Sequence, residues 1–143
     1  MKGSSMLAGS EASKPEDDFS MRAVLAMDEE VVWVDICALS DVIPGTGVAA
    51  MVNGEQIAIV RSPDGSRVFA ISNFDPFSKA FVLARGIVGD RGGILKIASP
   101  IYKQNFDLNT GVCLDDPSVR LPVYPVKIEG ERIVLASRKS ETK

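Results

Sequence analysis

The feature that most constrains this chain is a series of short β-branched segments separated by turn residues, which begins at Val31. Residues 31–37 read Val-Val-Trp-Val-Asp-Ile-Cys, side chains that suit a pleated, half-buried surface better than a helix. Segments 48–52 and 56–60 are separated by Asn53-Gly54, a pair that readily adopts positive φ in a tight hairpin turn. The sequence therefore predicts an antiparallel, all-β domain.

Two further strand groups complete this pattern. A Ser-Pro-Asp-Gly turn precedes a predicted strand at 67–71. Near the far end, predicted strands at 123–128 and 132–135 flank a Glu-Gly-Glu turn. Pro125 cannot donate to a β-ladder, so it marks the first of these two strands as an edge strand or a strand start.

The segment between the two strand groups, residues 73–118, has a different composition. It is rich in glycine and proline, and only short strands such as 94–98 fit within it. Residues 78–85 are the one modest helix candidate. A long irregular insertion in a compact domain is usually functional or forms an interface. We therefore expect a small sandwich or barrel with an inserted loop-rich subdomain over about 73–118.

The chain ends differ from this central region. Residues 1–28 are polar, without a steady apolar period, and we expect a mobile N-terminal extension there. Residues 138–143 are expected to form a loose C-terminal tail. The single domain is accordingly predicted to span 29–137, a length that can bury one ordinary core.

Charge and hydropathy exclude several partners. The chain has 16 basic and 19 acidic residues, a net charge of −3, with no long positive stripe, so nucleic acid is not an expected partner. No apolar run of about 18 residues is present to span a bilayer, and the N-terminus lacks a leader-like pattern. The sequence therefore predicts a cytoplasmic protein without a membrane partner.

The side-chain inventory restricts the chemistry further. The chain has no histidine, whereas catalytic triads, zinc sites and haem sites normally use imidazole. Its two cysteines are Cys37, in a predicted strand, and Cys113, in a distant turn-rich segment. We expect two free thiols, with a Cys37–Cys113 disulfide as the alternative. No catalytic, cofactor-binding or metal-binding residue is expected in this chain.

Two loop motifs carry a resemblance to Rieske ferredoxins. Residues 99–107 read Ser-Pro-Ile-Tyr-Lys-Gln-Asn-Phe-Asp and are followed by a Thr-Gly turn at 110–111. They resemble the family's second cluster-binding loop, which runs Cys-Pro-x-His-Gly-x-x-Phe-Asp before a Thr-Gly turn. Residues 73–75, Asn-Phe-Asp, stand where the first loop has Cys-x-His. The resemblance covers roughly 31–136 and implies a Rieske-like fold.

All four cluster-ligand positions are changed relative to that family. The resemblance places Asn73 and Ser99 where the cysteines would stand, and Asp75 and Tyr102 where the histidines would stand. Oxygen donors of this kind do not suit a [2Fe–2S] centre that needs two thiolates and two imidazoles. We expect these residues to hydrogen-bond across the gap that a cluster would bridge, and the same loop tips to form part of a docking surface.

Three motifs in order, at 73–78, 85–92 and 99–104, are similar to the small-subunit family of NAD(P)H-dependent assimilatory nitrite reductases. That family has a Rieske-like domain without metal ligands. The resemblance implies a cytoplasmic accessory subunit with no cofactor of its own. Its implied partner is the large subunit, which carries FAD, an iron–sulfur cluster and sirohaem and reduces nitrite to ammonium.

A local charge excess indicates a docking face. Residues 75–105 contain five basic and two acidic residues, a net charge of +3 in a chain of net charge −3. Such an excess can steer a loop face toward an acidic partner, although a solvated loop has the same composition. The candidate docking residues are Lys79, Arg85, Arg91 and Lys103.

Several aromatic and glycine residues receive structural interpretations. Phe74, Phe77 and Phe81 are expected to pack the loop layer onto the sheets, and Trp33 is expected in the core. Glycines between 86 and 93 are interpreted as turn glycines, because a dinucleotide-binding fingerprint must open a helix and residues 94–97 predict a strand.

Two other functions remain open from the sequence. One is a cluster-less Rieske-like interaction or regulatory module for a different partner. The other is an electron-transfer ferredoxin with unusual ligands, for which bound iron would be the signature.

Overall fold

The computed structural model describes residues 31–138 of the 143-residue chain. Trp33–Leu135 forms one compact unit, and the second unit comprises Met1–Val32 and Ala136–Lys143, of which only the outer ends of two strands are described. The extension predicted at 1–28 and nearly all of the tail predicted at 138–143 therefore lie outside the described residues. No helix in the described part is long and apolar enough to cross a membrane.

A four-stranded antiparallel sheet has the order β11-β5-β4-β3. Its strands are β3 (Gly47–Val52), β4 (Glu55–Arg61), β5 (Val68–Ser72) and β11 (Val123–Tyr124). The β3–β4 hairpin turns at Asn53 and Gly54, with φ of 52° and 82°, and Val52 pairs with Glu55 across it. This two-residue turn with both φ positive confirms the predicted hairpin.

A three-stranded sheet has the order β12-β13-β2. Its strands are β2 (Val31–Ala38), β12 (Val126–Glu129) and β13 (Arg132–Arg138). The hairpin predicted around the Glu-Gly-Glu turn is confirmed for β12 and β13. The continuous strand predicted at 123–128 is wrong, because its first part, β11, pairs with β5. Pro125 lies between β11 and β12, and its fixed φ and missing N–H allow the chain to pass from one sheet to the other at that residue.

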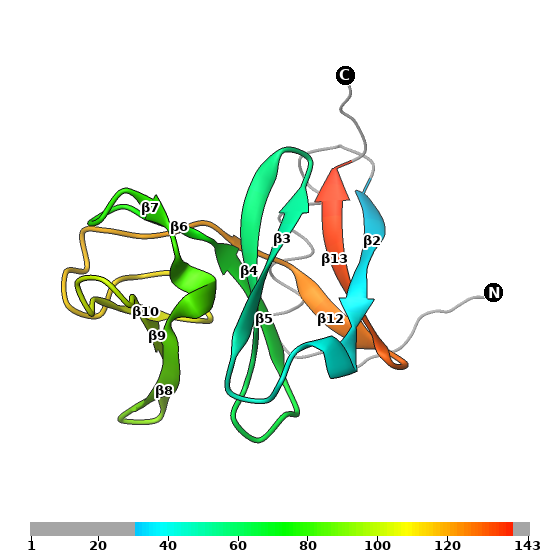
Figure 1. The fold of residues 1–143 in the computed structure, drawn as a ribbon, viewed down its shortest axis with the longest axis horizontal. Helices are drawn as coiled ribbons and strands as arrows, with labels where there is room; N and C mark the ends of the chain where they lie inside the picture. The colour runs from blue at the N-terminus through cyan, green and yellow to red at the C-terminus, as the bar shows by residue number, and fades with distance from the viewer. Residues whose placement is uncertain (1–30, 139–143) are drawn as a thin grey trace. The chain divides into compact units, whose positions relative to one another are not determined.

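The loop-rich segment forms two small antiparallel units, shown in green to yellow in Figure 1. One is the hairpin of β6 (Phe74–Asp75) and β7 (Ala80–Phe81). The other is a sheet of β8 (Ile87–Arg91), β9 (Ile94–Ala98) and β10 (Asn105–Asp107). The strand predicted at 94–98 is confirmed. Two short 3₁₀ turns, η1 (Leu39–Asp41) and η2 (Leu83–Arg85), complete the described elements.

The modest helix candidate at 78–85 does not form an α-helix. Lys79 has φ of 62°, which interrupts a right-handed helix at its second residue. The N–H groups of Leu83 and Ala84 donate to the backbone oxygen and the Oδ1 of Asn73, at 3.1 and 2.7 Å, instead of to carbonyls one turn earlier. The result is the β6–β7 hairpin followed by the single turn η2.

The core lies on both faces of the four-stranded sheet. Residues 57–60 of β4 are all buried, and alternate side chains enter different clusters, as expected for a strand covered on both faces. Ala58 and Val60 join the cluster that includes Phe106 and Ile97 of the loop segment. Ile57 and Ile59 join the cluster that includes Ile133 and Leu135 of β13. The loop segment and the three-stranded sheet thus pack against opposite faces of β4.

Trp33 does not lie in either core cluster, contrary to the prediction. It is half-buried, and the Lys127 Nζ stands 4.2 Å from its ring centroid. A cation over an indole face is favourable at a wet surface, which explains why a large aromatic residue is stable at this position. Cys37 and Cys113 are free thiols, as expected.

Candidate functional site

The centre of the candidate site is a direct contact between two loops. The first loop comprises residues 73–82, around the β6–β7 hairpin, and the second loop comprises residues 99–104, between β9 and β10. The Ser99 Oγ donates to the Asp75 Oδ2 at 2.5 Å, and both residues are fully buried. This hydrogen bond joins the two loops at the position where the sequence resemblance places a metal cluster.

The Asp75 carboxylate organises the first loop. Its Oδ1 accepts the backbone N–H of Phe77 at 2.9 Å, and its Oδ2 accepts the Ser78 hydroxyl at 2.8 Å in addition to that of Ser99. Burial on its own raises the pKa of this carboxyl group. The hydrogen bonds from Ser99, Ser78 and the loop backbone outweigh that effect, and the pKa of Asp75 lies below its ordinary value. Asp75 is therefore an ionised hydrogen-bond acceptor at neutral pH.

The two loops share one local architecture. The Ser99 Oγ accepts the backbone N–H of Ile101, two residues later, as the Asp75 Oδ1 accepts that of Phe77. The backbone oxygens of Asp75 and Ser99 accept the N–H groups of Lys79 and Lys103, each four residues later, at 2.7 and 3.1 Å. Both lysines have left-handed backbone conformations, with φ of 62° and 66°. Asp75 and Ser99 are therefore equivalent positions of two matching turns.

Asn73 has a different role from the one expected of it. Its Oδ1 accepts the backbone N–H of Ala84 at 2.7 Å, and its Nδ2 donates to the Gln56 Oε1 at 3.1 Å. Its backbone N–H donates to the backbone carbonyl oxygen of Gln56 at 3.0 Å. These bonds fix η2 and the start of the first loop to β4, and none of them reaches the second loop.

Tyr102 lies at the surface. Its side chain is 62% exposed and makes no hydrogen bond within residues 31–138. Of the four residues expected to meet across the gap, the structure brings together Asp75 and Ser99. Asn73 is buried beside the first loop, and Tyr102 projects from the tip of the second loop.

A second set of hydrogen bonds, which the sequence did not predict, joins Asp115 to Asn105 at the end of the second loop. The Asp115 Oδ2 accepts the backbone N–H and the Nδ2 of Asn105, at 2.8 and 3.0 Å. Hydrogen bonds from Asn105, with the nearby Arg91 guanidinium, hold the pKa of Asp115 below its ordinary value. Asp115 lies within the loop-rich insertion predicted over about 73–118, but the sequence holds no signal for its contact with Asn105.

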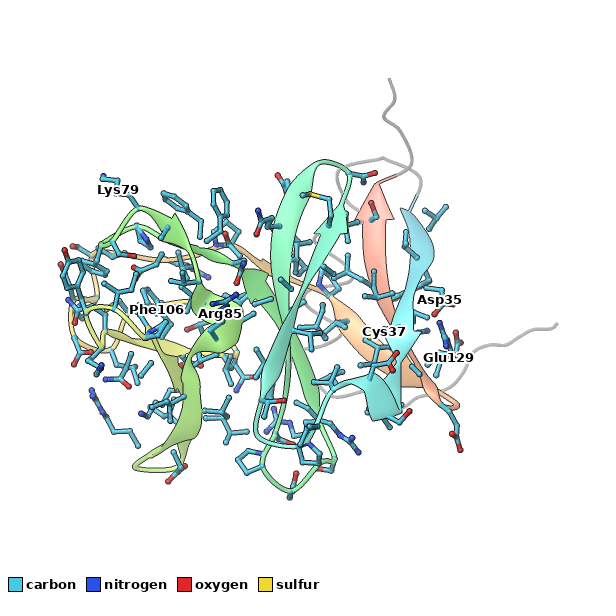
Figure 2. The ribbon with its side chains drawn as sticks, in the orientation of Figure 1. Asp35, Cys37, Lys79, Arg85, Phe106 and Glu129 are labelled. Atoms are coloured by element: carbon cyan, nitrogen blue, oxygen red, sulfur yellow. The ribbon has the colours of Figure 1, made fainter. Side chains whose placement is uncertain are left out.

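The candidate docking residues occupy different settings. Lys79 and Lys103 lie exposed in the two turns, and the Lys103 Nζ donates to the Pro100 oxygen at 3.3 Å. Arg91 forms an ion pair with Asp115 at 3.3 Å. Figure 2 shows Lys79 at the outer end of the first loop, with Arg85 on η2 well away from it. The four cations therefore do not form one patch.

The phenylalanines of the first loop pack in two pairs. The Phe74 and Phe81 rings contact each other with centroids 5.1 Å apart and planes tilted by 57°, and Phe81 is 54% exposed. Phe77 lies 6.2 Å from the buried Phe106 and packs on the core. Phe77 thus anchors the loop as expected, while Phe81 forms part of the surface.

The donor set in these loops does not fit a [2Fe–2S] cluster of the Rieske kind. Such a cluster needs two thiolates on one iron and two imidazoles on the other. The facing groups are a carboxylate and a hydroxyl, hard oxygen donors that are hydrogen-bonded to each other. Within the described residues, no group of three or more Cys, Asp or Glu side chains could hold a metal ion.

Comparisons with known proteins agree with this architecture. Residues 32–136 match the family model described as a Rieske-like [2Fe-2S] domain. The chain is 44% identical over 97 residues to the nitrite reductase (NADH) small subunit of Salmonella typhimurium, which covers 68% of this chain and 90% of that protein. The solved structure of the Escherichia coli protein NirD has a TM-score of 0.70 and 39% identity, covering 76% of this chain and 98% of that one.

One relative carries the same domain inside a larger chain. The nitrite reductase [NAD(P)H] large subunit of Klebsiella oxytoca is 37% identical over 101 residues, which are 71% of this chain and 10% of that protein. The domain therefore occurs both as a separate chain and as one segment of a large subunit.

Proposed function

Because the chain belongs to the Rieske-like [2Fe-2S] domain family and, within it, to the nitrite reductase small subunits, we propose that it is the accessory small subunit of an NAD(P)H nitrite reductase. In this function it supports a catalytic large subunit and carries no cluster or catalytic residue of its own. The complex reduces nitrite to ammonium in the cytoplasm, with FAD, an iron–sulfur cluster and sirohaem in the large subunit.

The observation that carries this proposal is the Asp75–Ser99 hydrogen bond. Cluster-bearing loops of this family bring soft donors together around two irons, whereas here a carboxylate and a hydroxyl close the gap directly. Each loop also makes an internal hydrogen bond of its own, which supports its shape. A domain built in this way supplies a rigid recognition surface and no redox step.

The partner is supported by the occurrence of the domain in a large subunit. In the Klebsiella oxytoca protein, a segment similar to this chain is covalently part of the nitrite reductase large subunit. A domain that exists both fused and separate is expected to contact the rest of the enzyme in both arrangements. We propose that the loop face, with Lys79, Arg85, Arg91 and Lys103 as candidate contacts, docks on the large subunit.

Co-expression tests the proposal. The large subunit is produced alone and together with this chain, a tag on the large subunit is used for purification, and nitrite-dependent NAD(P)H oxidation is measured for both preparations. We expect this chain to co-purify and to increase the activity or its persistence. Equal activity in both preparations, with no co-purification, would contradict the proposed function.

A further inference from the structure

We propose that Lys79 and Lys103 form a paired cationic contact that binds surface carboxylates of the nitrite reductase large subunit. This inference rests on the proposed function and deepens it, because it selects two residues from the four candidates and states the chemistry of the partner surface. It follows from the backbone conformation of the two lysines, their exposure and the Asp75–Ser99 hydrogen bond that joins their two loops.

The backbone conformation is the first observation. Lysine has no special tolerance of the left-handed region, where its Cβ crowds the following carbonyl oxygen, whereas glycine adopts it freely. Within residues 31–138, the non-glycine residues with positive φ are Asn53, Lys79 and Lys103. Asn53 is of a type that tolerates this conformation in hairpin turns. The two lysines therefore carry a local strain that glycine at the same positions would relieve.

Lys103 persists at a position that glycine would fit without strain. Its φ is 66°, a conformation that glycine adopts freely. A strained residue that persists where a strain-free one is available points to a function of its side chain. Lys79, at the equivalent position of the first loop, has the same property.

The surroundings of the lysines favour contact with an anionic partner. Segments 76–82 and 100–104 contain Lys79 and Lys103 and no acidic residue, and Asp75 is buried and turned toward Ser99. The Lys79 ammonium makes no ion pair within the described part of the chain. Two exposed cations without a counter-charge attract carboxylates, which suits a docking role.

The Asp75–Ser99 hydrogen bond connects the two turns that carry the lysines. Lys79 and Lys103 each lie four residues after one member of the Asp75–Ser99 pair and bond back to that member's backbone oxygen. The two ammonium groups are therefore carried on one connected unit. Ile101 and Tyr102, 46% and 62% exposed, lie beside Lys103 and add an apolar contact to the cationic one. A polar rim with an aromatic anchor is typical of a protein interface.

Glycine substitutions separate two effects of each lysine, the strain of its backbone and the charge of its side chain. In Lys79→Gly and Lys103→Gly, removal of the strain should raise Tm by roughly 2–4 °C, while loss of the cation should weaken binding to the large subunit roughly three- to fivefold. The double variant should bind at least about tenfold more weakly. Binding is measured between the purified full-length small subunit and the large subunit at two salt concentrations, and Tm by calorimetry of the small subunit.

Matched variants test whether weaker binding comes from any loss of positive charge, or from a change in loop shape, instead of from the loss of these two lysines. Lys127→Gln removes one exposed positive charge on β12, in the sheet that packs on the other face of β4 from the loop segment, and we expect its affinity to stay within about twofold of wild type. Lys79→Gln and Lys103→Gln should weaken binding without the gain in Tm, and Lys→Arg variants should retain binding. The wild-type interaction should weaken with added salt, and that of the double glycine variant should respond less to salt.

The outcomes distinguish this inference from the proposed function. If the wild-type chain fails to bind the large subunit, the proposed function is contradicted. If the wild type binds and the double glycine variant binds equally tightly, the paired contact is overturned while the proposed function stands. A lower Tm in both glycine variants would overturn the strain argument on which the selection of the two lysines depends.

Discussion

The Ser99 hydroxyl donates to the Asp75 carboxylate at 2.5 Å in a fully buried contact that joins the two loops of the candidate site. Three donors from two loops converge on this one carboxylate. Loss of one of these donors should lower the stability of the fold, because a buried carboxylate is costly unless its hydrogen bonds are satisfied. The stability should also depend on pH, because the carboxylate can be protonated.

Replacement of Ser99 by alanine should lower the free energy of unfolding by about 2 kcal/mol at pH 7, since the buried carboxylate loses one of its donors. Ser118→Ala is the matched control, because the Ser118 Oγ also donates to an aspartate, Asp116, at 2.7 Å but at the surface. The control should lose at most about 0.5 kcal/mol. Urea unfolding measures both variants, and equal losses would show that the loop contact contributes no more than a surface turn.

The stabilising effect of the Asp75 charge should disappear at low pH. The hydrogen bonds hold the pKa of Asp75 in the folded chain below its value in the unfolded chain, about 3.9. A depressed folded pKa contributes stability that is present above the unfolded pKa and lost as the pH falls through the folded pKa. The stability difference between wild type and Asp75→Asn should therefore be largest near pH 7 and smaller at pH 3.

Denaturant unfolding of these two proteins at several pH values provides the test. Subtraction of the Asp75→Asn curve removes the contributions of other carboxyl groups, including Asp64, whose pKa is lowered to about 2 by its hydrogen bonds to Ser62 and Ser66. A difference that stays constant from pH 7 to pH 3 would show that Asp75 does not titrate as the loop geometry requires.

Asn73 should be needed for the position of η2. Asn73→Ala leaves the buried N–H of Ala84 without its 2.7 Å acceptor, and we expect a loss of about 1–3 kcal/mol in unfolding free energy. Amide hydrogen exchange should become faster at Ala84 than in wild type, while residues of the β3–β4 hairpin remain protected. Unchanged exchange at Ala84 would contradict the assigned role.

Two glycines near β8 should respond differently to alanine. A Cβ on Gly86 would stand 2.2 Å from the Ala98 oxygen, a backbone atom that cannot move aside, and Gly86→Ala should cost about 1–3 kcal/mol. Gly89 has room, since its nearest neighbour would be the flexible Lys96 side chain at 3.5 Å, and Gly89→Ala should be nearly neutral. Equal thermal stability of the two variants would contradict the close approach seen at Gly86.

Local patterns in the sequence predicted local features of the fold. The Asn53-Gly54 turn and the strand at 94–98 both follow from residue chemistry within a few positions, and both are confirmed. The modest helix candidate at 78–85 did not form a helix, because Asn73, outside that segment, accepts the N–H groups of Leu83 and Ala84. The predicted strand at 123–128 failed because a change of sheet at Pro125 depends on partners far away in the sequence.

In the candidate site, too, the sequence predicted some features, and it missed the contacts between distant segments. The family resemblance indicated which loops face each other, and the expectation of a polar contact between them holds for Asp75 and Ser99. It could not show that Asn73 bonds to Gln56 or that Asp115 supports Asn105, because those contacts join segments without a shared motif. The left-handed conformation of the two lysines was equally hidden, because lysine gives no signal for it.

The most direct test of the account is the iron and acid-labile sulfide content of the purified full-length chain, produced with ample iron and kept without oxygen, together with its visible absorption spectrum. The account predicts no stoichiometric iron and a colourless protein, because the loops offer oxygen donors that are already bonded to each other. Two irons per chain with a reducible visible chromophore would contradict it.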